Sequence, residues 1–420
     1  MRTRAELSRF VGGLPTNLKV MMARSSIANF SANVNPYSSL YVIALGATAS
    51  QLGLLNSASL ALSSLVTLLT GWISDRWDRK TIYLAGALAG VLVPLLYVAA
   101  PGWTWLVPAF VLYGLSDGLV TPSWQAMYAN SVGNRRRGRV YGLANVFILA
   151  PILFAGIVGG EIVSRSGGLI AAGIRPVYWL QAFLLAGAWI LVWRGLRIQG
   201  GSRPGGLTPG RMLSDYREVL RKPGVRSWVL MKSLGSISVG MAGPFWMVYA
   251  AMVHGASAMT IAYMVTARTL TQILLSPFSG RLVDAMGRKK MIILGRVVMY
   301  AGTAVFLLWG SGPLLILAWV LMGVNDSTGI AWSAEEAELV PPGQRSRMTA
   351  LSHGAFNALA VPASILGGYL YDYVNPLTPF VVMVLIDGLV RMPIIHLLVP
   401  ESSTMTHEGE GEDVNAYSME

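Results

Sequence analysis

The sequence predicts an all-α membrane protein with twelve transmembrane helices in two pseudo-symmetric six-helix bundles. Three observations support this fold class. Of the 420 residues, 54% are hydrophobic and only 12% are charged, whereas an ordinary soluble domain has roughly 25% charged residues. Apolar segments of about 20 residues, the length that crosses a bilayer, recur along the chain. The two halves of the chain also repeat one another in one register.

Each apolar segment is predicted to be a helix, because backbone polar groups in lipid must be hydrogen-bonded within the protein. Strands of a membrane barrel would be shorter and would alternate in polarity. The approximate bounds of the twelve spans are 20–43, 50–71, 81–100, 103–127, 138–160, 176–195, 226–250, 258–279, 290–309, 313–335, 346–370 and 376–399.

The basic residues predict the orientation of these spans. With the N-terminus inside, all but four of the 32 Lys and Arg lie in inner segments or adjoining helix ends, the exceptions being Arg165, Arg175, Arg268 and Arg391. This positive-inside asymmetry predicts a multi-pass plasma-membrane protein with both termini in the cytoplasm. The net charge of +12 then indicates contact with anionic lipid headgroups, and no nucleic-acid partner is expected.

The spans and their connections predict five regions. They are a cytoplasmic N-terminal segment at 1–19, a six-helix bundle at 20–195, a cytoplasmic linker with a short helix at 196–225, a second six-helix bundle at 226–399 and a disordered acidic cytoplasmic tail at 400–420.

The internal repeat relates the two predicted bundles at a shift of 208 or 209 positions. Pro36 matches Pro244, VLYGLSD ending at Asp117 matches VLMGVND ending at Asp326, and Trp124 matches Trp332. Parallel repeats of this kind are typical of transporters in which two halves rock about a central site.

Two charged loops also occur at the repeat spacing, GWISDRWDRK from Gly71 and GRLVDAMGRKK from Gly280. With them, nearly the whole chain resembles the major facilitator superfamily, whose loop after the second helix reads approximately G-x-L-a-D-R-x-G-R-R/K. The matching residues are Gly71, Asp75, Arg76, Arg79 and Lys80 in the first copy and Gly280, Asp284, Gly287, Arg288 and Lys289 in the second.

The resemblance implies a conformational latch at these loops. In the family, the acid at Asp75 meets the cytoplasmic start of the eleventh helix, here near Ser346, in the outward-open state. By symmetry Asp284 would face the start of the fifth span near Gly138. Asp78 stands where the family has glycine, and we expect it to adopt the left-handed turn that aspartate tolerates better than most residues. Gly114 stands where drug–proton antiporters of the family often carry arginine.

Two carboxylates in the membrane are candidates for binding substrate or a proton. Asp117 and Asp326 occupy equivalent positions near the middle of the fourth and tenth spans, and a charge there is expensive unless it faces a cavity or a partner. The resemblance implies that these helices line the central cavity. A structural role, in which each aspartate bonds a neighbouring helix, is an equal alternative.

Buried basic residues allow a binding role and a structural one. Arg268 can bind a substrate carboxylate or phosphate, but an ion pair with Asp326 or Asp387 is favoured, because buried charges are usually paired. Asp387 and Arg391 are four residues apart on one helix face, and this favours a structural pair.

Other polar and aromatic side chains in the spans are candidates for a cavity lining. They could equally serve helix–helix contacts or packing. They are Asn29 and Asn33 on the first span, Trp246 on the seventh, and His353 and Asn357 on the eleventh.

The predicted function is secondary active transport of a small solute by alternating access. Proton coupling is expected, with a slight preference for export of amphipathic, drug-like compounds. Uptake or uniport of a small organic solute is the alternative, and a transporter-like sensor is an alternative of another class. No catalytic set, metal cluster or nucleotide motif is visible, so neither an enzyme nor a cofactor is expected. The expected partners of a monomer are the solute, protons and lipids.

Overall fold

The computed structural model describes residues 15–73, 78–130, 147–197, 209–329, 332, 336, 339–340 and 344–398. Within these ranges the chain is helical and contains no strand. The elements in order are α2 Thr16–Asn33, α3 Ser38–Ala44, α4 Ala49–Ile73, α5 Arg79–Ala99, η1 Trp103–Leu106, α6 Val107–Asn130, α8 Ile152–Arg165, α9 Ala171–Gly195, α10 Pro209–Leu220, α11 Val225–Ala242, η3 Gly243–Phe245, α12 Trp246–Met252, α13 Ala258–Met286, α14 Arg288–Leu308, α15 Gly312–Ser327, α17 Arg345–Tyr373, α18 Thr378–Ile386, η5 Asp387–Arg391 and α19 Met392–Leu398.

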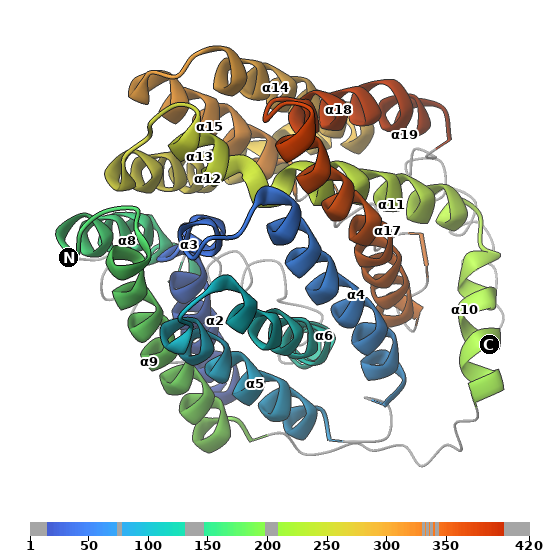
Figure 1. Ribbon diagram of the computed structural model, residues 1–420. Helices are drawn as coiled ribbons and strands as arrows, with labels where there is room; N and C mark the ends of the chain where they lie inside the picture. The colour runs from blue at the N-terminus through green and yellow to red at the C-terminus, as the bar shows by residue number, and fades with distance from the viewer. Residues whose placement is uncertain are drawn as a thin grey trace, which may run out of the picture.

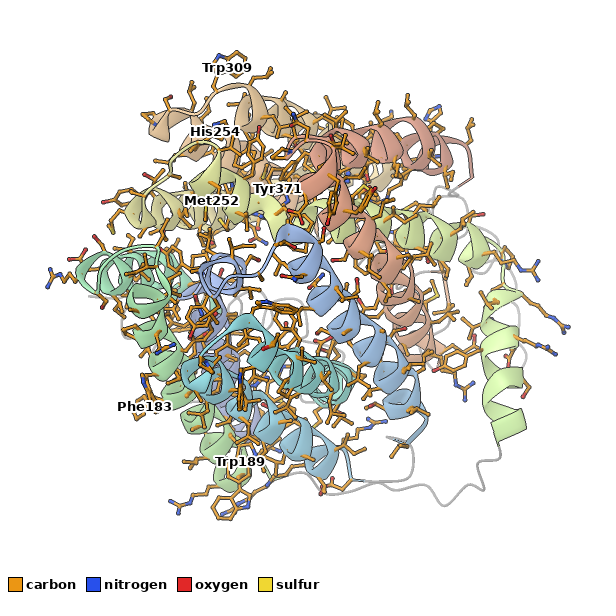
Figure 2. The ribbon with its side chains drawn as sticks, in the orientation of Figure 1. Phe183, Trp189, Met252, His254, Trp309 and Tyr371 are labelled. Atoms are coloured by element: carbon orange, nitrogen blue, oxygen red, sulfur yellow. The ribbon has the colours of Figure 1, made fainter. Side chains whose placement is uncertain are left out.

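The helices confirm the predicted all-α membrane fold. Nine stretches in the described part of the chain are long and apolar enough to cross a membrane, and Gly312–Ser327 is a shorter apolar helix. Large apolar side chains cover the outside of the bundle, where Phe183 is 76% exposed and Trp309 is 50% exposed; both point away from the helices in Figure 2. Such a surface suits lipid rather than water.

The helices form two groups, which we call the first half (α2–α9) and the second half (α11–α19). In Figure 1 the first half is blue to green and the second is yellow to red. Two seams join them, α4 against α17 and α8 against α13. Helix α10 lies near the end of α4, since a Cβ added at Gly71 would be 3.3 Å from the Tyr216 hydroxyl. We call this end of the bundle the linker end and the other the opposite end.

Two predicted spans are broken at equivalent points of the repeat. The first is divided into α2 and α3 around Pro36, and the seventh into α11 and α12 around Pro244. Proline has no backbone N–H to donate and its ring obstructs the preceding turn, so the same residue interrupts both helices. The seventh span still runs as one apolar helical stretch from Val225 to Met252, as predicted, because the 3-10 turn η3 joins α11 to α12 without a gap.

Two other sequence expectations are corrected. The predicted fifth span ends at 160, but α8 continues to Arg165, whose side chain pairs with Glu161 one turn earlier. Asp78 does not adopt a left-handed turn; its φ is −60°, and its carboxylate caps α5 by accepting hydrogen bonds from Lys80 N and Thr81 N. The side-chain cap stabilises the helix start without unusual backbone geometry. The equivalent Gly287 does use a positive φ of 86°.

Gly114 allows α6 to approach α4 closely, and the position has no room for the arginine found in many antiporters. A Cβ added there would lie 2.3 Å from the Ser59 carbonyl oxygen. We expect Gly114→Ala to reduce the free energy of unfolding by about 1–3 kcal/mol, because the added methyl group overpacks the interface. The midpoint of thermal unfolding should fall accordingly. Gly187→Ala on α9 is the matched control, because nothing lies within 4 Å of its added Cβ. Equal unfolding midpoints for the two variants would contradict this prediction.

Candidate functional site

Asp326 and Arg268 neutralise one another in the second half. Arg268 on α13 donates from Nε to Asp326 Oδ2 at 2.5 Å and from Nη2 to Oδ1 at 3.1 Å. The guanidinium carbon also lies 5.2 Å from the ring centroid of Trp319. Two parallel N–H···O bonds are the favourable geometry of an arginine–carboxylate pair. The structure therefore contains one of the two ion pairs that the sequence allowed for Arg268.

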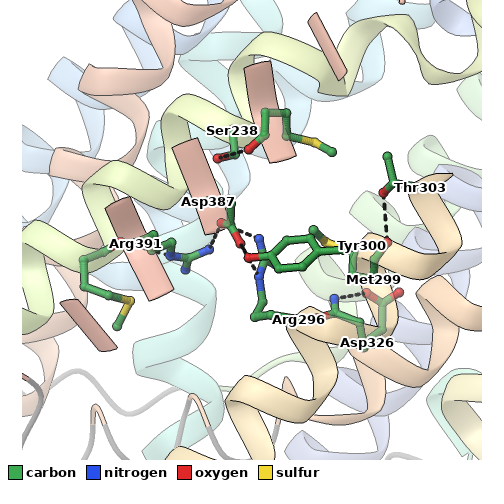
Figure 3. A network of polar contacts seen from close by, with 11 residues as sticks. Ser238, Arg296, Met299, Tyr300, Thr303, Asp326, Asp387 and Arg391 are labelled. Atoms are coloured by element: carbon green, nitrogen blue, oxygen red, sulfur yellow. Dashed lines mark hydrogen bonds and ion pairs between the residues drawn. The ribbon is translucent and has the colours of Figure 1, made fainter. Parts of the chain in front are cut away.

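Asp387 is the centre of a second buried network (Figure 3). Its side chain is fully buried and contacts two arginines, Arg296 at 2.5 Å and Arg391 at 3.0 Å. The Tyr300 hydroxyl donates to the same carboxylate at 2.5 Å. The sequence favoured a pair between Asp387 and Arg391, and this pair is present, on a turn of π-helix. The count of basic residues places Arg296 among those of the inner segments and adjoining helix ends. In the structure it is a buried side chain inside α14.

Lys232 is also paired in the second half. It forms an ion pair with Glu336, whose carboxylate accepts a further bond from the Trp228 indole at 3.3 Å. The charged side chains in these three networks of the second half are thus joined to partners of opposite sign.

Asp117 has a different environment, although the repeat makes it equivalent to Asp326. Its carboxylate accepts hydrogen bonds from two hydroxyl groups, Ser63 at 2.6 Å and Thr121 at 2.9 Å. No cation among the described residues pairs with it. The carboxylate is therefore held in the membrane by neutral donors.

Arg24, the equivalent of Lys232, likewise has neutral partners in the described part of the chain. Its Nε donates to the Tyr83 hydroxyl at 2.6 Å, and its guanidinium carbon lies 4.2 Å from the Trp124 ring centroid. The two halves therefore differ in electrostatics: the second contains closed ion pairs, and the first holds an acid and a base by hydroxyls and rings.

Asn357 connects Asp117 to the second half. The Asn357 amide on α17 donates to Ser63 Oγ at 3.2 Å, and the Ser63 hydroxyl donates to Asp117. His353 Nδ1 lies 3.5 Å from the same amide, which is too long for a firm hydrogen bond. Ser63 and Asn357 are buried. Asn357, Ser63 and Asp117 therefore form a continuous chain of hydrogen bonds across the α4–α17 seam.

The remaining cavity candidates do not converge on Asp117. Asn33 donates to the Asn29 carbonyl one turn earlier at 2.9 Å, within α2. Trp246 packs edge-on against Phe306 and Phe380, with ring centroids 4.9 and 4.7 Å apart. This is the packing role that the sequence allowed as an alternative to stacking on a substrate.

The proposed latch is described only in part. Asp75 and Arg76 lie outside the described residues, as does the side chain of Asp284. Gly71 faces α17, because an added Cβ would be 3.6 Å from Ala350 Cβ. Lys80 instead caps the end of α9, donating to the carbonyls of Trp193 and Leu196 at 2.9 and 2.6 Å. The cation there stabilises the C-terminus of a helix within the first half.

At the opposite end, the structure shows a contact between the halves that the sequence did not predict. The Asp372 carboxylate on α17 accepts hydrogen bonds from Ala49 N at 3.2 Å and Ser50 N at 2.6 Å, at the start of α4. In the sequence, Asp372 comes just after the predicted eleventh span (346–370), where a polar residue is expected at the membrane surface. Ser63 was also missed, because it lies among several serines on α4 and its spacing does not distinguish it.

These features define a multi-pass helical membrane protein made of two related halves with a polar connection between them. The family model of the Major Facilitator Superfamily matches residues 20–263 and 228–414. The chain belongs to this superfamily, as its two charged loops indicated.

Similar proteins include a vesicular transporter and a multidrug resistance protein. The vesicular acetylcholine transporter of Drosophila melanogaster is 26% identical over 38% of this chain, but the match spans only 28% of that protein. The multidrug resistance protein MdtG of Salmonella typhi is 27% identical over 63% of this chain and 66% of its own length. The chain thus spans less than two thirds of both relatives.

Two solved structures have the same fold. The nucleoside transporter NupG is 14% identical with a TM-score of 0.72, and the alignment covers 90% of this chain and 99% of NupG. The human organic anion transporter MFSD10 is 13% identical with a TM-score of 0.67, over 90% and 99% of the two chains. Identities this low establish the fold alone.

Proposed function

We propose that this protein is a secondary transporter that exports amphipathic organic cations in exchange for protons, with Asp117 as the residue that binds either one. The supporting observation is that the partly buried Asp117 carboxylate has, among the residues that the structure describes, two hydroxyl groups as its hydrogen-bond partners and no cation. Asp326, the other candidate from the sequence, is engaged by Arg268, so a proton or a cation would have to displace a guanidinium there.

The substrate class follows from the charge of this site. A carboxylate in the membrane without a cationic partner is costly, and either an organic cation or a proton would relieve that cost. Because one carboxylate cannot hold both, arrival of a proton releases the cation. The similarity to the multidrug protein MdtG and to the vesicular acetylcholine transporter supports transport of such compounds.

The proposed location is the plasma membrane, with the linker end in the cytoplasm. The distribution of Lys and Arg supports this orientation. Alternating access would then open the site at the linker end to take up the compound and at the opposite end to release it.

The test is transport of ethidium, an amphipathic cation, by purified protein in liposomes with an imposed proton gradient. The unmodified protein is expected to accumulate ethidium against its gradient, and Asp117→Asn is expected to abolish accumulation, because an amide carries neither the charge nor a titrating proton. The control is the double variant Asp326→Asn with Arg268→Gln, which removes both charges of the pair and should keep the coupling. Accumulation by Asp117→Asn at the unmodified level would overturn the proposal.

A further inference from the structure

Among the residues that the structure describes, four side-chain hydrogen bonds cross the seam between α4 and α17 in its membrane-spanning part. Three of them join serine or asparagine side chains to backbone carbonyls or to another serine. These are Asn56 to Ser364 Oγ at 3.0 Å, Ser57 to the Val361 carbonyl at 2.7 Å and Ser64 to the Gly354 carbonyl at 3.0 Å. None of these three ends on a titratable group.

The fourth bond is different because it continues to a carboxylate. Asn357 donates to Ser63, and Ser63 donates to Asp117. Asp117 belongs to the first half and Asn357 to the second, so the acid reaches the other half through one hydroxyl group. Residues 63 and 357 are 2% and 5% exposed, so the bond that crosses between the halves is shielded from water.

The direction of the two bonds depends on the charge of Asp117. A serine hydroxyl has one proton, and an ionised carboxylate can only accept, so the Ser63 proton points at Asp117 and its lone pairs accept from Asn357. Bonds to an ionised acceptor are about twice as strong as neutral ones, and bonds in such a chain strengthen one another. When Asp117 takes up a proton, the charge is lost and the acid becomes a donor, so the bond between the halves weakens.

Few other charged or titratable groups on the neighbouring elements could produce this effect. Helix α4 has none between Ala49 and Ile73, and η1 has none. The groups on α6 and on the other elements packed against it are Tyr113 and Tyr128 on α6 itself, Arg79, Lys80, Tyr83 and Tyr97 on α5, and Arg345, Arg347, His353, Tyr369, Tyr371, Asp372 and Tyr373 on α17. Of these, His353 lies beside Asn357 on the far side of the seam, so it needs its own control.

We propose that Asn357 is a positioning residue that makes the contact between the two halves depend on the proton state of Asp117. The inference rests on the proposed function, in which Asp117 binds the coupled proton. With Asp117 ionised, the Ser63–Asn357 bond holds α17 against α4. Neutralising the acid releases this bond, and the halves separate at the linker end.

The absence of cysteine from the sequence allows a direct measurement of this separation. Spin labels on Leu69→Cys of α4 and Leu282→Cys of α13, both exposed, report the distance between the halves at the linker end. Pulsed electron resonance in lipid nanodiscs, from mildly alkaline to mildly acidic pH, should show the long-distance population growing relative to the short one. We expect about a tenfold change in their ratio, as for loss of one neutral hydrogen bond at the strong end of the usual range.

The variants separate the proposed contact from general weakening of the seam. Asn357→Leu and Ser63→Ala should lose the pH-dependent change, whereas Ser63→Thr, which keeps the hydroxyl, should retain it. Ser64→Ala, which removes a hydrogen bond on the same seam without touching Asp117, and His353→Gln should behave like the unmodified protein. Size-exclusion profiles confirm that each variant is folded.

The inference is overturned if Asn357→Leu and Ser63→Ala keep the pH-dependent change, or if the unmodified protein shows none. The ethidium assay tests the proposed function separately. If Asp117→Asn still accumulates ethidium while Asn357→Leu has lost the distance change, proton coupling through Asp117 is wrong but the contact stands. If Asp117→Asn is uncoupled while Asn357→Leu keeps the distance change, the contact is wrong and the coupling stands.

Discussion

Replacing Asp387 by asparagine is expected to destabilise the protein more than any other single substitution that removes a charge from the membrane-spanning helices. Asp387 is fully buried and holds the guanidinium groups of Arg296 and Arg391. Removing the acid leaves two buried cations facing one another without compensation. Breaking a buried ion pair from one side costs about 3–5 kcal/mol, and here both pairs are broken at once.

The measurement is the midpoint of thermal unfolding of purified protein in detergent. Arg296→Met is the matched control, because it removes one cation from the same network and leaves the pair of Asp387 and Arg391 intact. We expect a clear order, with Asp387→Asn far below Arg296→Met and Arg296→Met close to the unmodified protein. An Asp387→Asn midpoint at or above that of Arg296→Met would show that the network does not depend on its acid.

Replacing Asp372 by asparagine is expected to open the opposite end of the bundle. Its carboxylate accepts hydrogen bonds from the backbone of Ala49 and Ser50 at the start of α4, where the helix dipole is positive. An anion at an exposed helix N-terminus contributes about 0.3–1 kcal/mol, which corresponds to a shift of up to roughly fivefold between two states. Because α17 and α4 belong to different halves, losing this contact favours separation of the halves there.

Spin labels at Trp105→Cys and Leu308→Cys, which are exposed on the two halves, report the distance at the opposite end. Asp372→Asn should increase the long-distance population, and Asp372→Glu, which keeps the charge, should remain near the unmodified distribution. If the asparagine and glutamate variants give the same distribution, the charge of Asp372 does not hold the halves together.

The site could be predicted from the sequence only in part. The sequence singles out Asp117 and Asp326 as carboxylates within predicted spans, but the repeat makes them equivalent. Arg268 distinguishes them in the structure, since it pairs with Asp326, whereas the described partners of Asp117 in the first half are Ser63 and Thr121. Periodicity shows which face a side chain is on but not its distance from a side chain on another helix.

The interior contacts show the same limit. Arg296 reads as one more inner basic residue, because a count of charges has no depth coordinate, yet it is buried against Asp387. Asp372 reads as a polar residue at a helix end, and its role depends on the first residues of α4, more than 300 positions earlier. Ser63 resembles Ser57, Ser59 and Ser64 on the same helix, and only the packing of α6 places a carboxylate beside it.

By itself the sequence determined the all-helical membrane fold and the superfamily. Bilayer thickness imposes the length of each span, the absence of water imposes helices, and paired charged loops identify the family. Only the tertiary structure decided which buried charges neutralise one another and which do not, because ion pairing falls off within a few ångströms and those distances are set by how helices pack. That packing distinguishes Asp117 from Asp326, and it places Asn357 where it can respond to the charge of Asp117.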